Sequence, residues 1–131
     1  MKRTAIVILL ALAVLVFSAQ TVVYVNSAVV TWNPVTKLMD GSPVPANEIN
    51  YEVVIARPAD KANFVSLGEV VSPPFTVTLP QQGDWLVGVR AIRSISGERF
   101  LSSFLWSDET TDPFVLRYYL GPAAPTDLRL Q

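Results

Sequence analysis

Short runs in which apolar and polar side chains alternate constrain the fold of this chain more than any other feature of its sequence. In the clearest run, residues 85–92, every second residue is apolar, and these residues share one face of the expected strand: Trp85, Val87, Val89 and Ala91. Residues 49–56 and 75–79 repeat the pattern. A period of two residues is that of a half-buried β-strand, and the ten prolines fall between the runs, where their missing backbone donor is tolerated. The sequence therefore predicts an all-β domain.

These runs and the turn residues between them predict about seven short strands with turn signals every eight to twelve residues or so, a spacing typical of a β-sandwich. Among the connections, we expect a polar connection around Pro58 at 57–63 and a hairpin turn that contains Gly97 at 94–99. We expect a seven-stranded antiparallel β-sandwich over residues 20–107, followed by a C-terminal extension at 108–131. A small eight-stranded barrel is the alternative, because the same alternation lines the inside of a barrel. Seven strands are few for closure, which favours the sandwich.

The first 19 residues have the form of a secretory signal peptide. Lys2 and Arg3 precede an unbroken run of small and apolar residues at 5–17, and a cleavage site is expected near Ser18 or Ala19. The predicted signal-peptide helix makes the protein secreted or cell-surface, either periplasmic or extracellular. Retention as a membrane anchor is the alternative, but a spanning helix needs about 20 apolar residues, and this run is shorter.

The charge distribution argues against nucleic acid as a partner. The chain has ten basic and eleven acidic residues, and removal of Lys2 and Arg3 with the signal peptide leaves a net charge of −3. The remaining lysines and arginines occur singly along the chain. Phosphate binding needs clustered positive charge, so we expect no nucleic-acid binding.

Histidine and cysteine are both absent, which removes the residues of nucleophilic triads, of thiol chemistry and of most transition-metal sites. The six glycines form no phosphate-binding loop. Asp108, Glu109 and Asp112 offer oxygen ligands of the kind that Ca²⁺ takes, but their spacing favours a solvated acidic connection. We expect no enzyme activity, no cofactor and no metal.

Three segments together resemble the fibronectin type III domain of the immunoglobulin-like superfamily. They are Val-Val-Thr-Trp-Asn-Pro at 29–34, Ile-Asn-Tyr-Glu-Val at 49–53 and Leu-Pro-Gln-Gln-Gly-Asp-Trp-Leu-Val-Gly-Val-Arg-Ala at 79–91. The resemblance implies a fibronectin type III-like sandwich whose structural core includes Trp32, Tyr51, Leu79 and Trp85. Trp85 stands where the family usually has a corner tyrosine, whose hydroxyl bonds to the backbone upstream. The family serves adhesion, spacing and recognition, which implies a binding module.

The C-terminal extension leaves several interpretations open. Residues 114–120 are strongly apolar and aromatic, which predicts either an extra strand on the sandwich or an adhesive patch for a partner. Residues 122–130 resemble the opening of a second fibronectin type III domain. This tail is a loosely packed end, a remnant of a tandem array, or a strand that pairs through Leu128 and Leu130 with its own sandwich or with a neighbouring subunit.

The predicted function is that of a secreted, non-catalytic module for adhesion, protein–protein interaction or extracellular assembly, with another protein or a second copy as its partner. The candidate partner-binding residues are Trp106, Phe114, Tyr118, Tyr119, Leu128 and Leu130. The alternative is a carbohydrate-binding accessory domain that stacks sugars on Trp106, Tyr118 or Tyr119. A membrane becomes a partner only if the N-terminal segment is retained.

Overall fold

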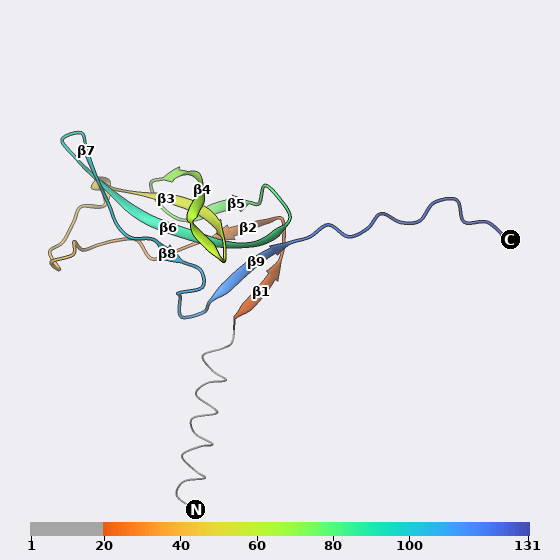
Figure 1. Ribbon diagram of the computed structural model, residues 1–131. Helices are drawn as coiled ribbons and strands as arrows, with labels where there is room; N and C mark the ends of the chain where they lie inside the picture. The colour runs from red at the N-terminus through yellow and green to blue at the C-terminus, as the bar shows by residue number, and fades with distance from the viewer. Residues whose placement is uncertain (1–19) are drawn as a thin grey trace, which may run out of the picture.

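The computed structural model describes residues 20–131 and shows an all-β chain (Figure 1). Residues 20–131 contain nine strands: β1 (Thr21–Tyr24), β2 (Ser27–Val30), β3 (Ile49–Arg57), β4 (Asp60–Val70), β5 (Phe75–Thr78), β6 (Gly83–Ile95), β7 (Glu98–Leu101), β8 (Leu105–Trp106) and β9 (Phe114–Tyr118), with a 3₁₀ turn η1 at Ala46–Glu48. The predicted signal peptide lies outside the described residues. No helix within 20–131 is long and apolar enough to span a bilayer.

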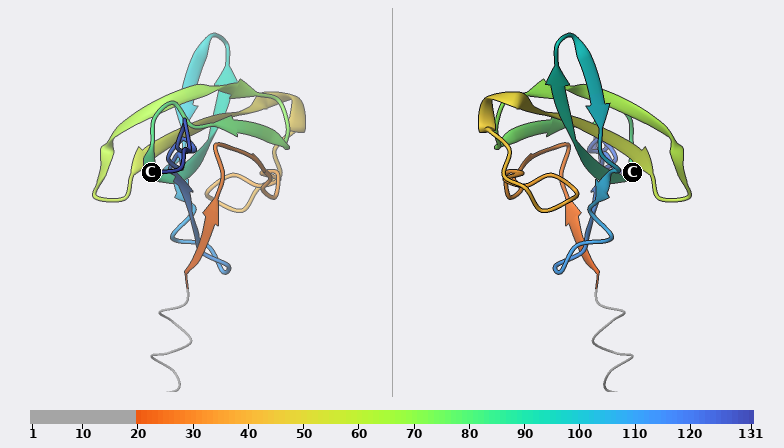
Figure 2. Two further views of the ribbon diagram at one scale, coloured as in Figure 1. Left: turned by 90° about the vertical axis from the view of Figure 1, so that its right-hand side faces the viewer. Right: turned by 90° about the vertical axis from the view of Figure 1, so that its left-hand side faces the viewer.

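The strands form two sheets. The larger has seven strands in the order β1-β9-β6-β3-β4, with β7 and β8 also paired to β6, and the smaller consists of β2 and β5. The prediction of an all-β, sandwich-like fold is thus confirmed. The prediction of purely antiparallel pairing is wrong, because β1 runs parallel to β9. The two views of Figure 2 show β1 and β9 together at one edge of the large sheet, with β4 at the other.

Strand β9 places the C-terminal boundary of the sandwich later than predicted. It pairs with β6 through Gly83↔Tyr118 to Trp85↔Leu116 and with β1 through four residue pairs. Of the two interpretations of residues 114–120, the extra strand is therefore the one that the structure contains. Within the predicted extension, residues 108–113 form the connection that leads into β9, and residues 119–131 follow β9 without adding a strand.

Strands β3 and β6 form the centre of the fold. They pair continuously from Ile49↔Arg93 to Ala56↔Leu86, and the side chains of residues 53–56 are completely buried. Consecutive strand residues point to opposite faces, so both faces of the large sheet must be covered here. The inner face packs against β2 and β5 around Val77 and Leu79, and the outer face carries a second cluster that includes Val54 and Trp106.

Trp106 covers the outer face directly above a glycine. Gly88 of β6 is paired with Trp106 of β8, and a Cβ atom at residue 88 would lie 2.8 Å from two carbons of the indole ring. Phe104 and Phe64 extend this aromatic layer. The ring centroids of Trp106 and Phe104 lie 5.2 Å apart, and those of Phe104 and Phe64 lie 4.9 Å apart. A glycine is required at residue 88 because the ring approaches the backbone so closely.

Two of the connections between strands can be compared with the turns expected from the sequence. The turn predicted at 94–99 joins β6 to β7, with Ser96 and Gly97 at φ 51° and 82°. By contrast, the polar connection expected at 57–63 is mostly strand, because β4 already begins at Asp60. Its polar residues lie on an exposed edge strand, where alternation with apolar residues is not required.

We predict that Gly88→Ala destabilises the protein by about 1–3 kcal/mol, because the new methyl group forces Trp106 out of its place. Urea unfolding followed by tryptophan fluorescence measures the change. Gly121→Ala is the matched control, since no atom lies within 4 Å of its added Cβ. Equal stability of the Gly88→Ala protein and the wild type would contradict the packing described for Trp106.

Candidate functional site

The four residues expected in the core occupy the interior to different degrees. Tyr51, Leu79 and Trp85 are buried, whereas Trp32 is only partly buried and packs between the inner cluster and a further cluster around Tyr51. The Tyr51 hydroxyl accepts a hydrogen bond from the Val35 backbone N–H at 2.8 Å. Tyr51 thereby fixes the loop that follows β2.

Trp85 forms a backbone contact at the corner before β6. Its indole Nε1 donates a hydrogen bond to the carbonyl oxygen of Gln81 at 2.9 Å. The Arg57 guanidinium lies 3.8 Å from the centroid of the Trp85 ring and donates hydrogen bonds to the carbonyl oxygens of Gln82 and Asp84. The turn before β6 is therefore held by an indole and a guanidinium.

The structure separates the six candidate partner-binding residues into an internal and an external group. Trp106 is only 7% exposed, and Phe114 and Tyr118 are half-buried against the inner cluster. Tyr119 is 61% exposed, and Leu128 and Leu130 are fully exposed. From the sequence, Trp106 could either stack on a sugar or cover an edge of the core, because a short strand ending in tryptophan does not show which surface the ring covers.

The aromatic residues of the carbohydrate-binding alternative do not form one platform. Trp106 belongs to the cluster on the outer face of the large sheet, whereas Tyr118 packs against the cluster on the inner face. Sugar stacking requires the exposed face of an aromatic ring. Of the three residues, Tyr119 alone has most of its surface exposed, so the arrangement offers no flat row of rings.

The most exposed apolar segment is the C-terminal tail, residues 119–131. It leaves the end of β9 and runs away from the body of the domain (Figure 1). The Leu120 backbone N–H donates a hydrogen bond to Gln82 Oε1 at 2.7 Å. Farther along the tail, Arg129 donates hydrogen bonds to Asp127. Within the described chain, the tail pairs with no strand.

An apolar opening lies beside β2, between the two sheets. It has a volume of about 300 Å³ and is lined by Val23, Ala28, Val29, Val30, Thr31, Phe114 and Leu116. The small sheet consists only of β2 and β5, so within residues 20–131 the outer edge of β2 has no neighbouring strand. Unpaired edges of this kind accept strands from other chains.

A second apolar groove lies near the β6–β7 hairpin. Its volume is about 430 Å³, and its lining includes Leu38, Met39, Ile49, Ile95, Phe100 and Leu101. Figure 1 shows β7 at the end of the molecule opposite the tail. The strand at this groove carries the charged residues Glu98 and Arg99, which distinguishes it from the uncharged edge at β2.

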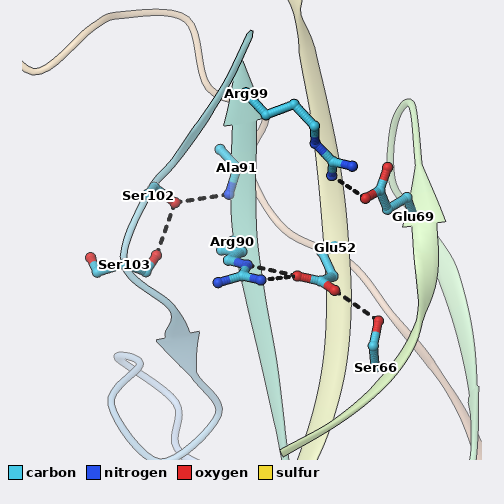
Figure 3. Close-up of polar contacts among 8 residues, drawn as sticks. All are labelled: Glu52, Ser66, Glu69, Arg90, Ala91, Arg99, Ser102 and Ser103. Carbon is cyan, nitrogen blue, oxygen red and sulfur yellow. Dashed lines mark hydrogen bonds and ion pairs between the residues drawn. The ribbon is translucent and has the colours of Figure 1, made fainter. Parts of the chain in front are cut away.

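Charged side chains on the large sheet are paired with one another. Figure 3 shows Arg90 of β6 bound to Glu52 of β3, which accepts a further hydrogen bond from Ser66 of β4 at 2.8 Å. In the same view Arg99 of β7 pairs with Glu69 of β4. Carboxylates engaged in this way tie neighbouring strands together.

The same close-up shows how the segment between β7 and β8 is held to β6. Ser102 Oγ accepts a hydrogen bond from the Ala91 backbone N–H at 2.8 Å and donates one to the Ser103 carbonyl oxygen at 2.9 Å (Figure 3). This serine continues the contact of the chain with β6 between β7 and β8. Ser102 therefore helps to hold this segment against β6.

The acidic connection at 107–113 is partly neutralised by a lysine. Lys61 of β4 lies 3.1 Å from Asp108 Oδ1 and 3.0 Å from Glu109 Oε1. Nowhere in the described part of the chain do three acidic, histidine or cysteine residues group closely enough to hold a metal ion. These contacts anchor the connection to the sheet.

A bidentate ion pair joins β9 to β6. Arg117 donates from Nε to Asp84 Oδ1 at 2.7 Å and from Nη2 to Oδ2 at 3.0 Å. These hydrogen bonds hold the pKa of the Asp84 carboxyl below its usual range, against the opposing effect of partial burial. The pair lies immediately before the point at which the tail leaves the domain.

Compared with protein-family models, with curated proteins and with solved structures, the chain matches none of them. Its function must be inferred from its own surfaces. Two of these are complementary in character: a tail with exposed leucines, and an unpaired strand edge beside an apolar opening.

We predict that the Asp84–Arg117 pair makes stability depend on pH in acid. A carboxyl whose pKa is lower in the folded state stabilises the fold above its unfolded pKa of about 3.9, and this stabilisation is lost as the pH falls through the folded value. Both side chains are one-third exposed, so the contribution should be about 0.2–1 kcal/mol.

Urea unfolding of the wild type and of Asp84→Asn between pH 6 and pH 2 or so tests this prediction. The wild type should lose more stability over this range than Asp84→Asn does. Asp112→Asn is the control for loss of one carboxylate from the chain. Identical pH profiles for the wild type and Asp84→Asn would contradict the role assigned to the pair.

Proposed function

We propose that this chain is a secreted, non-catalytic, fibronectin type III-like module that assembles with protein partners by strand addition, and that residues 119–131 are the segment it donates. One observation carries the proposal. Leu128 and Leu130 are fully exposed on a tail that pairs with no strand of the described chain. A tail of this kind can gain both hydrogen bonds and apolar contacts from a partner.

The energetics favour a partner for the tail. Burial of one leucine side chain is worth about 1.5–3 kcal/mol, and the two leucines alternate as residues on one face of a strand do. Association itself costs at least about 4 kcal/mol in lost translational and rotational freedom. We therefore expect weak, concentration-dependent assembly.

Two further observations support an extracellular structural role. The N-terminal sequence has the basic and apolar regions of an export signal. The carboxylates and arginines described on the large sheet are occupied in pairs that hold strands together. A domain whose polar groups serve its own sheet and whose apolar end is exposed suits assembly better than catalysis.

The tail hypothesis predicts that the weight-average mass of the protein rises with concentration. Light scattering on residues 20–131, which contain every described strand, should show this rise, and a chain that ends at Gly121 should remain monomeric. The shortened chain keeps β9 and the hydrogen bond from Leu120 to Gln82.

Two charge-neutral variants separate the leucines from the rest of the tail. Leu128→Asn combined with Leu130→Asn should abolish the rise in mass, because the apolar contacts are lost. Asp127→Asn combined with Arg129→Gln is the matched control and should assemble as the wild type does. A wild-type chain that stays monomeric at millimolar concentration, or equal assembly by the shortened chain, would refute the proposed function.

A further inference from the structure

The acceptor for the donated tail can also be located. We infer that Leu128–Gln131 of one copy pairs with the outer edge of β2 in a second copy, and that its leucines enter the apolar opening between β2 and the β1–β9 pair. This inference rests on the proposed function. It adds the acceptor site and the identity of the partner, a second copy of this chain.

The hydrogen-bond pattern of the small sheet shows which backbone groups of β2 are free to accept a strand. The Leu79 N–H donates to the Asn26 carbonyl oxygen at 2.9 Å, and the same register continues with Ala28↔Val77 and Val30↔Phe75. Hydrogen-bonded pairs alternate with non-bonded pairs in an antiparallel ladder. The N–H and C=O groups of Ser27 and Val29 therefore point away from β5, toward the open edge.

The surroundings of this edge suit the two leucines. Val23 of β1, Phe114 and Leu116 of β9 line the opening on one side, and Ala28 and Val30 of β2 line it on the other. A strand added to β2 would direct alternate side chains between the two sheets, as Ala28 and Val30 are directed. Leu128 and Leu130 have this spacing, and Arg129 would face outward with Val29.

Charge distinguishes the β2 edge of the small sheet from two strands of the large sheet, the edge strand β4 and the hairpin strand β7. Proteins protect such edges with charged residues, and β4 carries Asp60, Lys61 and Glu69 while β7 carries Glu98 and Arg99. The four residues of β2 are Ser-Ala-Val-Val. Strands β1 and β5 also carry no charged residue, but the Arg117 guanidinium lies over the Tyr24 ring at the end of β1, and no residue of β5 lines the apolar opening. The β2 edge therefore combines an uncharged strand with an apolar opening and lacks the usual protection against an added strand.

The course of the tail favours a second copy over the same chain. The tail runs outward from the end of β9 (Figure 1), and a return to its own β2 would require the chain to reverse direction close to Gly121. Pro122 and Pro125 favour an extended connector. Asp127, at φ 59°, then separates this connector from the segment that carries Leu128 and Leu130. Repeated head-to-tail addition gives an open chain of subunits.

Disulfide trapping tests the acceptor, because the native chain contains no cysteine and every disulfide must join introduced residues. Two differently tagged full-length chains are co-expressed, one with Val29→Cys and the other with Arg129→Cys or Gln131→Cys. Val29 is 69% exposed, so this substitution should preserve the fold. After treatment with diamide, we expect a heterodimer with either tail cysteine, and its loss when Leu128→Asn and Leu130→Asn are added.

Val65→Cys on the edge strand β4 and Leu101→Cys beside the β7 groove are matched acceptor controls, since both residues are about half exposed. Neither should link to the tail. Linkage to Leu101→Cys or Val65→Cys, with assembly still dependent on the tail, would overturn the β2 acceptor and leave the proposed function intact. A bond formed only within single chains that carry Val29→Cys and Arg129→Cys would overturn the second copy as partner. If no pair links and the mass stays monomeric, both proposals fail.

Discussion

The continuous pairing of β3 with β6 is the interaction on which the rest of this structure depends. The two strands match over residues 49–56 and 86–93, and burial on both faces of β3 requires a covering layer on each side. The small sheet supplies the inner layer. The aromatic series of Phe64, Phe104 and Trp106 supplies the outer layer, and Gly88 permits its closest approach. The fold is thus organised around one antiparallel pair of strands that lie far apart in the sequence.

The course of β1 links this architecture to the proposed function. Because β1 pairs with β9 of the large sheet, it is not available to extend the small sheet at β2. The result is an uncharged edge beside an apolar opening. At the end of the same β9 strand, the ion pair between Asp84 and Arg117 fixes the point from which the tail departs. Strand β9 is therefore connected to both proposed sites. The proposed donor tail leaves its end, and its pairing with β1 leaves the proposed acceptor edge of β2 open.

Sequence periodicity was informative wherever every second residue of a strand is apolar, so that at least one face is fully apolar. The alternation in 49–56, 75–79 and 85–92 predicted β3, β5 and most of β6, and the turn at Ser96 and Gly97 was evident from its residues. The parallel pairing of β1 could not be predicted, because the four residues of β1 do not specify the distant strand with which they pair. The sequence left the burial of Trp106 open for a similar reason, since the ring packs on a strand eighteen residues away. The tail was recognised as a candidate site from Leu128 and Leu130, but its acceptor requires the three-dimensional arrangement of the sheets.

The most direct test of this account is residue-resolved hydrogen exchange at the outer edge of β2. The Val29 amide should exchange rapidly in dilute solution, whereas the Ala28 and Val30 amides, which face β5, should be protected. At high concentration the Val29 amide of the intact chain should become protected, and that of the chain ending at Gly121 should not. A Val29 amide that is already protected in the dilute monomer, or one whose exchange is independent of concentration and of the tail, would contradict strand addition at β2.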